Sequence, residues 1–274
     1  MSDPRLTPMN ARVAAAHLRD VPEGVRRVEG SARQINLPVV DLLRSPEGKR
    51  DRQLLYGETL RVFEERDGWA FVQADKDGYV GYLPGTSLSV LQPATHWVSA
   101  PATHAYDAAD MKSPDLATLS FGSLVTVTGS ATGFAETPLG FVPKVHLSEI
   151  DTCMTHPVAV AAGFLGTPYL WGGNSRCGID CSGLVQAALL ACGTTCPGDS
   201  DLQQADLGKT LPDGTPPKRG DLLFWKGHVA WVADPQTILH ANAAHMAVAY
   251  EPIQAAIERI QAQGDGPVTA HKRL

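Results

Sequence analysis

Residues 169–192 read Tyr-Leu-Trp-Gly-Gly-Asn-Ser-Arg-Cys-Gly-Ile-Asp-Cys-Ser-Gly-Leu-Val-Gln-Ala-Ala-Leu-Leu-Ala-Cys, a glycine-rich turn that runs into an apolar segment. Asp180 is a typical helix N-cap and Gly193 a typical stop, so the stretch predicts a helix over 181–192. Cys181 then stands at the helix start, where free backbone N–H groups and the helix dipole favour a thiolate and can bind an oxyanion. This placement predicts a nucleophilic cysteine.

The other cysteines lack this context. Five cysteines in 274 residues are too few for a disulfide scaffold, and their odd number leaves one unpaired in any case. We therefore expect reduced thiols. Apart from Cys181, we interpret the cysteines as small apolar packing residues, namely Cys153, Cys177, Cys192 and Cys196.

A nucleophilic thiol needs a base and a group that orients the base. Residues 227–241 read Gly-His-Val-Ala-Trp-Val-Ala-Asp-Pro-Gln-Thr-Ile-Leu-His-Ala, two alternating segments around an Asp-Pro turn. A hairpin centred on Asp234 places His228 and His240 opposite one another, with their Cβ atoms about 4.5–5.5 Å apart. The same alternation puts Ala230, Val232 and Ile238 on the face of the histidines, and Val229, Trp231 and Leu239 on the other face.

The chain around these motifs predicts an α+β domain. Residues 156–166 form a short apolar segment with Pro157 in its first turn, which indicates a helix. Strands are expected at 221–225, 228–233 and 237–241. Helices followed by a run of strands are typical of an α+β fold, which we assign to residues 151–274.

The N-terminal half contains an internal repeat. Residues 54–84 alternate in short apolar runs separated by Gly and Asp turns, and residues 119–143 repeat this pattern at an offset of 65. The matches include Gly57 with Gly122, Gly68 with Gly133 and Trp69 with Phe134; the two aromatic residues are predicted to fill barrel cores. The pattern is similar to two bacterial SH3-like domains in tandem, small β-barrels at 31–95 and 96–150, after an N-terminal segment 1–30.

Five sequence blocks together closely resemble NlpC-type cysteine peptidases of bacterial cell-wall metabolism, in the order of that family: Tyr169–Gly173, Gly178–Gly183, Arg219–Trp225, Gly227–Ala230 and Leu239–His240. The resemblance covers about residues 151–255. It implies a papain-like core with Cys181 as nucleophile, His228 as general base and His240 as its orienting partner. It also implies hydrolysis of peptide bonds in murein stem peptides.

Tandem SH3-like modules ahead of such a domain resemble a cytoplasmic subgroup that recycles muropeptides. Those enzymes cut between γ-D-glutamate and the diamino acid when the N-terminal L-Ala has a free amine. The match implies substrate-binding roles for Asp180, Ser182, Asp199 and Ser200. A carboxylate such as Asp199 suits an ammonium group. Tyr169 is either an aromatic packed under the site or a hydroxyl beside the oxyanion.

The repeat suggests where the first SH3-like module contributes. Positions shared by both copies are interpreted as framework, whereas positions that differ are candidates for a local function. Glu58 aligns with Ser123 and Tyr79 with Pro138, so we assign substrate binding to Glu58 and Tyr79. They would form a wall that closes the cleft, with Glu58 pairing the free amine of the substrate.

Charge and composition exclude other classes of protein. The formal net charge is −6, and none of the segments 1–95, 96–150 and 151–274 is net basic, so nucleic acid is not an expected partner. No apolar run approaches the roughly 18 residues of a membrane span. The N-terminus lacks the pattern of a secretory signal, so we expect a cytoplasmic protein.

Other chemistries have weaker support. Cys177, Cys181, His240 and His245 could be imagined as a zinc site, but their spacing differs from that of common zinc sites, and no metal or cofactor is predicted. Two alternatives stay open. The chain could be a murein-peptide-binding or adaptor protein without activity, or an amidase or acyltransferase using the same triad. The preferred diamino acid and the oligomeric state are left undecided.

Overall fold

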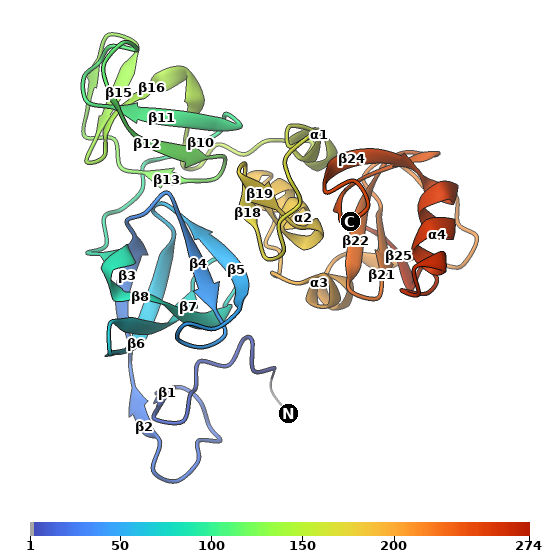
Figure 1. The fold of residues 1–274 in the computed structure, drawn as a ribbon, viewed down its shortest axis with the longest axis horizontal. Helices are drawn as coiled ribbons and strands as arrows, with labels where there is room; N and C mark the ends of the chain where they lie inside the picture. The colour runs from blue at the N-terminus through green and yellow to red at the C-terminus, as the bar shows by residue number, and fades with distance from the viewer. Residues whose placement is uncertain (1–2) are drawn as a thin grey trace. The chain divides into compact units, whose positions relative to one another are not determined.

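The computed structural model describes residues 3–274, which divide after Asp151 into two compact units (Figure 1). Each unit has its own sheets and core. Among the described residues, no helix is long and apolar enough to cross a membrane.

The first unit begins with a parallel pair of short strands, β1 (Val13–Ala15) and β2 (Arg26–Val28). A seven-stranded antiparallel sheet follows in the order β5-β4-β8-β7-β6-β3-β9. Its core is made of aliphatic side chains that alternate with polar ones along the strands, as the sequence pattern predicts. The strands are β3 (Ser31–Ile35), β4 (Val39–Leu43), β5 (Arg50–Leu55), β6 (Thr59–Arg66), β7 (Trp69–Ala74), β8 (Val80–Pro84) and β9 (Leu88–Ser89).

The remainder of the first unit contains a three-stranded sheet, β13-β10-β17, and a five-stranded sheet, β12-β11-β16-β15-β14. Buried Val98, Leu119 and Val125 form its core. The strands are β10 (His96–Val98), β11 (Ala102–Tyr106), β12 (Asp115–Ser120), β13 (Leu124–Val125), β14 (Gly129–Ala131), β15 (Phe134–Thr137), β16 (Gly140–Pro143) and β17 (Leu147–Glu149).

The internal repeat is visible in how the two halves of this unit end. Strand β8 ends at Pro84 and leads through the 3-10 turn η1 (Gly85–Ser87) into β9. Strand β16 ends at Pro143 and leads through η2 (Lys144–His146) into β17. The prediction that Trp69 and Phe134 fill the cores is wrong, because both side chains are only half-buried at the start of their strands.

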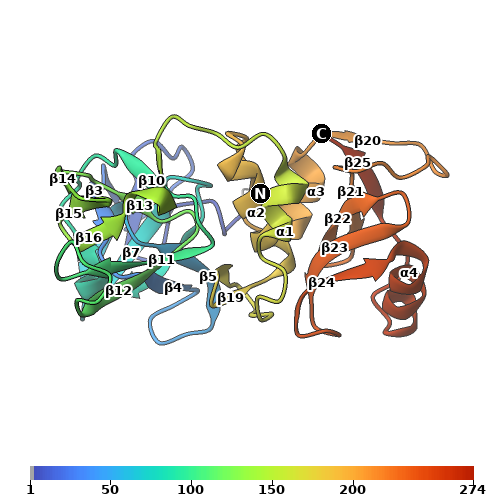
Figure 2. The ribbon, with the colours of Figure 1, turned by 90° about the horizontal axis from the view of Figure 1, so that it is seen from above.

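The second unit has the predicted α+β class. Its six-stranded sheet has the order β20-β25-β21-β22-β23-β24; α1 and α2 lie on one side and α4 on the other (Figures 1 and 2). A small hairpin, β18 (Asn174–Ser175) with β19 (Gly178–Ile179), precedes α2. The helices are α1 (Pro157–Ala162), α2 (Cys181–Ala191), α3 (Ser200–Asp206) and α4 (Ile253–Ala262); the sheet strands are β20 (Lys209–Thr210), β21 (Leu222–Trp225), β22 (His228–Asp234), β23 (Thr237–Asn242), β24 (Ala247–Pro252) and β25 (Ala270–Arg273).

The predicted register of the β22–β23 hairpin is wrong by two residues. Trp231 pairs with Leu239, whereas a hairpin centred on Asp234 would pair Trp231 with Thr237. A bulge between Val232 and Asp234 absorbs the difference. Because side chains alternate with period two, a shift of two residues leaves each side chain on its face. Ala230, Val232 and Ile238 accordingly share one cluster against Ala256 and Ile260 of α4.

Candidate active site

Helix α2 begins at Cys181, as the sequence predicts, and Asp180 is its N-cap. The Asp180 carboxylate accepts one hydrogen bond from the Gly183 N–H at 2.6 Å and another from the Gly172 N–H at 2.9 Å. The Ser182 hydroxyl donates to the same carboxylate at 3.0 Å. This cap therefore fixes the helix start to the preceding glycine-rich turn.

The glycines of this segment allow the turn to approach the helix. A Cβ atom on Gly183 would lie 2.6 Å from the carbonyl oxygen of Gly173, and one on Gly173 would lie 2.5 Å from the carbonyl oxygen of Gly178. Neither neighbour is a flexible side-chain end that could move away. Only glycine permits this packing under Cys181.

The Cys181 thiol is buried and receives backbone hydrogen bonds from Val229, Ser182 and Cys181 itself. Burial and the adjacent Asp180 carboxylate raise the pKa of Cys181 to about 12, although the three N–H groups oppose this rise. The N–H groups at the helix start thus favour the thiolate as expected, but burial and Asp180 outweigh them. The thiol is neutral at neutral pH, with N–H donors around the sulfur.

His228 and His240 lie on the same face of the sheet and contact one another. Nε2 of His228 is 2.9 Å from Nδ1 of His240, and the ring centroids are 5.1 Å apart. His228 begins β22, directly before Val229, whose N–H reaches the Cys181 sulfur. The structure thus brings together the three residues expected to carry the chemistry.

The chain of contacts continues beyond His240. Nε2 of His240 is 3.0 Å from Oε2 of Glu251 on β24, and Arg259 of α4 donates to both oxygens of that carboxylate, at 2.9 Å and 2.7 Å. The hydrogen bonds from Arg259 hold the pKa of Glu251 below its usual range. Burial lowers the pKa of His228 to about 3 and that of His240 to about 4. Both imidazoles are therefore neutral beside an ionised Glu251.

The remaining residues proposed for the second unit differ in their surroundings. Tyr169 is half-buried; burial above all, and the nearby Asp180 carboxylate, raise the pKa of its hydroxyl, which stays a proton donor. Ser182 and Ser200 are buried. Asp199 is the N-cap residue of α3, but its side chain makes no capping hydrogen bond. Substrate binding by these residues stays a proposal.

Glu58 and Tyr79 belong to the first unit. Oε1 of Glu58 is 2.8 Å from the Lys76 ammonium, while Oε2 is buried and has no hydrogen-bond partner within residues 3–274. Burial raises the pKa of Glu58 more than Lys76 lowers it. Tyr79 is 3% exposed, packs in the sheet core, and has the Arg52 guanidinium 5.7 Å from its ring centroid. Its substrate-binding role also stays a proposal.

Two families match this chain. Residues 166–261 match the NlpC/P60 family, and residues 42–88 match the bacterial dipeptidyl-peptidase Sh3 domain. The second unit therefore carries an NlpC/P60 domain. The prediction of an SH3-like domain ahead of the catalytic domain is confirmed for the first module, whereas the second module stays a prediction.

Curated relatives are named as dipeptidyl-peptidases. The gamma-D-glutamyl-L-lysine dipeptidyl-peptidase of Bacillus subtilis is 31% identical over 188 residues, 63% of either chain. Dipeptidyl-peptidase 6 of Lysinibacillus sphaericus is 27% identical over 69% of this chain and 79% of its own length. The match thus spans less than two thirds of the Bacillus subtilis relative.

A solved structure supports the fold. The crystal structure of an NlpC/P60 family protein from Bacillus cereus superposes with a TM-score of 0.73. The match covers 89% of this chain and 99% of that chain at 20% sequence identity. At this identity the similarity establishes the fold alone.

Sequence reasoning missed Glu251 and Arg259 of the NlpC/P60 domain. Strand β24 was not predicted, although residues 247–252 contain the alternation Ala-Val-Ala-Tyr-Glu-Pro. With His240 paired to Ala249, Glu251 lies two residues along the same face of β24. A hairpin prediction from residues 237–252 could have found the carboxylate. The position of Arg259 depends on how α4 packs, which no local pattern gives.

The cysteines other than Cys181 differ in exposure. All five cysteines are free thiols; Cys196 is buried, but Cys153 and Cys177 are exposed, so packing is the wrong interpretation for these two.

The zinc hypothesis involved different residues from those that the structure brings together. Donor atoms of His240, His245 and Glu251 lie within 4.8 Å of one another, a group that includes neither Cys177 nor Cys181. Because Arg259 engages both Glu251 oxygens, a cation there would compete with a guanidinium.

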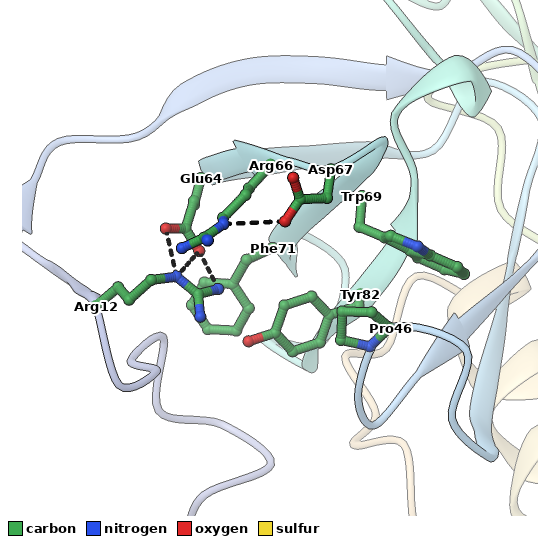
Figure 3. A pocket seen from close by; sticks show the side chains of 8 residues that line it. All are labelled: Arg12, Pro46, Glu64, Arg66, Asp67, Trp69, Phe71 and Tyr82. Carbon is green, nitrogen blue, oxygen red and sulfur yellow. Dashed lines mark hydrogen bonds and ion pairs between the residues drawn. The ribbon is translucent and has the colours of Figure 1, made fainter.

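A separate pocket of about 270 Å³ lies in the first unit (Figure 3). The aromatic rings of Trp69, Phe71 and Tyr82 line it on one side, and an Arg12–Glu64 ion pair lies across from them. None of the site residues predicted above lines it. Its lining explains the half-buried Trp69, whose side chain faces the pocket.

Proposed function

We propose that the chain is a cysteine peptidase that hydrolyses the γ-D-glutamyl–L-diamino acid bond of murein stem peptides with a free N-terminal L-Ala. The observation that carries the proposal is the contact of a buried thiol at a helix start with backbone N–H groups, next to the hydrogen-bonded pair His228 and His240. This arrangement contains a nucleophile, a base and an orienting group. The name of the Bacillus subtilis relative supports the bond that is cleaved, and the name of the Lysinibacillus relative supports the release of a dipeptide.

The reaction begins with transfer of the Cys181 proton to His228 as the sulfur attacks the γ-carbonyl carbon of D-glutamate. Because the thiol is neutral and the imidazole is a neutral base, transfer and attack are coupled rather than starting from a preformed ion pair. Backbone N–H groups at the start of α2 and the Tyr169 hydroxyl are donors for the developing oxyanion.

The tetrahedral intermediate collapses when the His228 imidazolium gives its proton to the amine of the diamino acid, which leaves. The thioester of Cys181 remains. A water molecule, deprotonated by His228, attacks the thioester carbonyl and releases the L-Ala-γ-D-Glu dipeptide, and the thiolate recovers the proton. The cycle returns the enzyme to a neutral thiol and a neutral imidazole.

Substrate selection is proposed to use carboxylates for the ammonium group of L-Ala. Glu58 is the favoured residue because its Oε2 is buried and lacks a hydrogen-bond partner in the described chain. Tyr79 is assigned to substrate binding as well. Asp199 and Ser200 at the start of α3, with Asp180 and Ser182 at the start of α2, are assigned to the peptide itself. Five free cysteines support a role in recycling in the reducing cytoplasm.

The test is mass spectrometry of products from L-Ala-γ-D-Glu-diamino acid peptides with free and with acetylated N-termini. We expect release of the L-Ala-γ-D-Glu dipeptide from the free peptides only, and none by the Cys181→Ala variant. Substrate that protects Cys181 from alkylation but is never cleaved would identify an adaptor instead. Cleavage of other amides, or acyl transfer to an amine, would reassign the reaction.

A further inference from the structure

We propose that Glu251 and Arg259 are positioning residues that fix the protons of the histidine pair and leave Nδ1 of His228 as the basic nitrogen. The inference rests on the proposed function only for its catalytic consequence. The proton positions themselves follow from the contacts.

The Glu251 carboxylate decides the tautomer of His240. An ionised carboxylate only accepts hydrogen bonds, and Oε2 of Glu251 lies 3.0 Å from Nε2 of His240, so this nitrogen carries the proton. A neutral imidazole has one protonated nitrogen, which leaves Nδ1 of His240 as an acceptor. Burial keeps His240 neutral by lowering its pKa to about 4.

The same reasoning passes to His228. Its Nε2 lies 2.9 Å from the accepting Nδ1 of His240, so Nε2 of His228 carries the proton and donates it. Nδ1 of His228 is then unprotonated. This nitrogen is the one that can take the proton of the Cys181 thiol, and a reversed tautomer would present an N–H to the sulfur instead of a lone pair.

Arg259 keeps Glu251 in the form that this arrangement needs. The guanidinium donates to both carboxylate oxygens and lowers the pKa of Glu251. The charged or titratable groups around the pair are His228 on β22, Glu251 on β24, Arg259 on α4, and His245 after β23. His245 directs its Nδ1 to Asn242 at 2.9 Å. Glu251 is therefore the acceptor that orders the chain of protons.

Glu251→Leu tests the assignment because it removes the acceptor that faces Nε2 of His240. Glutamine would not, since Oε2 accepts from both His240 and Arg259, and an amide oxygen in its place would still accept from both. With leucine, Nε2 of His240 faces an apolar side chain and the donor groups of Arg259, which favours its unprotonated form. His240 then carries its proton on Nδ1, and His228 on Nδ1 as well. We expect kcat to fall about 10²-fold or more while KM changes less than about twofold, since substrate contacts are unaffected.

Two direct readouts accompany the kinetics. Long-range ¹H–¹⁵N NMR of histidine-labelled protein identifies each tautomer: Nε2–H for both rings in the wild type, and Nδ1–H for both in Glu251→Leu. The rate of Cys181 alkylation by iodoacetamide should fall with kcat. Glu251→Asp should recover part of the activity, because a carboxylate is restored.

The matched control is Asp221→Asn. Asp221 accepts hydrogen bonds from Arg273 and His271 in nearly the same geometry, yet it lies outside the histidine pair. We expect its kcat to stay within about twofold of wild type. If Asp221→Asn loses as much activity as Glu251→Leu, or if Glu251→Leu keeps wild-type tautomers and kcat, the proposal is overturned.

Arg259→Gln provides a second test if Glu251→Leu does not fold. Burial is the main cause of the low pKa values of His228 and His240, and the Arg259 charge lowers them further. Loss of the guanidinium should therefore raise both pKa values and move the acid limb of kcat to higher pH, and an unchanged limb contradicts the proposal.

The NMR readout separates the two hypotheses. The expected tautomers without peptide cleavage would refute the proposed function alone. Cleavage with wild-type tautomers in Glu251→Leu would refute only the positioning role.

Discussion

Two carboxylates in the second unit are held by the same set of groups. Glu251 accepts from Arg259 and His240, and Asp221 accepts from Arg273 and His271. In both, the arginine contacts two oxygens and the imidazole uses Nε2. Asp221, which directly precedes β21, also accepts from the Lys218 N–H at 2.9 Å.

The difference lies in the second nitrogen of each histidine. Nδ1 of His240 forms a hydrogen bond with Nε2 of His228. The His240 side chain is 0% exposed, whereas the His271 side chain is 13% exposed. Around Asp221 the cluster joins the C-terminal strand β25 to the loop before β21. The comparison teaches that an Arg–carboxylate–His cluster is by itself a structural contact, and that only the Glu251 cluster continues to a second imidazole.

The largest expected effect is a loss of peptide hydrolysis that occurs in variants of the histidine pair and not in variants of the Asp221 cluster. Cys181→Ala or His228→Ala should reduce peptide hydrolysis about 10⁴-fold, because each removes a group that the chemistry requires. His271→Gln, the counterpart in the Asp221 cluster, should leave kcat within about twofold. Steady-state kinetics with circular dichroism of each variant checks this; equal losses at His228 and His271 would remove the distinction.

Acid should destabilise the two clusters in different pH windows. Burial holds His228 and His240 near pKa 3 and 4 in the folded state, below the ordinary 6.5, so the unfolded state binds more protons as pH falls. Stability should drop from about pH 6.5 toward pH 4, at up to about 1.4 kcal/mol per pH unit for each imidazole. In His240→Gln the free energy of unfolding, measured with urea across pH, should depend less on pH in this range.

The Asp221 window lies lower. Burial raises the pKa of Asp221, but hydrogen bonds from Arg273, Lys218 and His271 outweigh it and bring the pKa from 3.8 to about 2. The stability that this carboxylate supplies is present above pH 3.8 and is lost as pH falls toward 2. Asp221→Asn should remove the pH dependence of stability below pH 3.8 and lower the free energy of unfolding by about 2 kcal/mol at neutral pH. A smaller pH dependence between pH 6.5 and pH 4 in this variant would contradict the assignment.

The smallest expected effect, a change in KM, concerns a third buried carboxylate, that of Glu58, in which one oxygen has no hydrogen-bond partner within residues 3–274. Glu58 pairs with Lys76 through Oε1 alone, unlike Glu251 and Asp221. Glu58→Gln should raise KM for a free L-Ala-γ-D-Glu-diamino acid peptide about tenfold and narrow the preference over acetylated peptides. Unchanged kinetics would remove Glu58 from the substrate site.

The sequence predicted the features that depend on local chemistry. The start of α2 at Cys181 follows from the Asp180 cap, and the shared face of His228 and His240 follows from strand alternation. Alternation tolerates an even shift of register, which is why the faces were right although the pairing of Trp231 was not.

What the sequence did not predict depends on packing between distant segments. The pKa of Cys181 is raised because the thiol is buried, and burial cannot be derived from a helix N-terminus. Arg259 reaches Glu251 because α4 packs on the sheet, and Trp69 lines a pocket with Arg12 from the N-terminal segment. Each of these contacts joins residues that no periodic pattern relates.

The close approach of Gly173 to Gly183 sets a limit for protein engineering. Since any Cβ at either position would collide with backbone, a library that diversifies the substrate cleft should keep both codons fixed. Saturation mutagenesis should return glycine at 173 and 183 under selection for folding alone, without peptide substrate. Substitutions intended to change the substrate should therefore be made outside the glycine-rich turn that precedes Cys181.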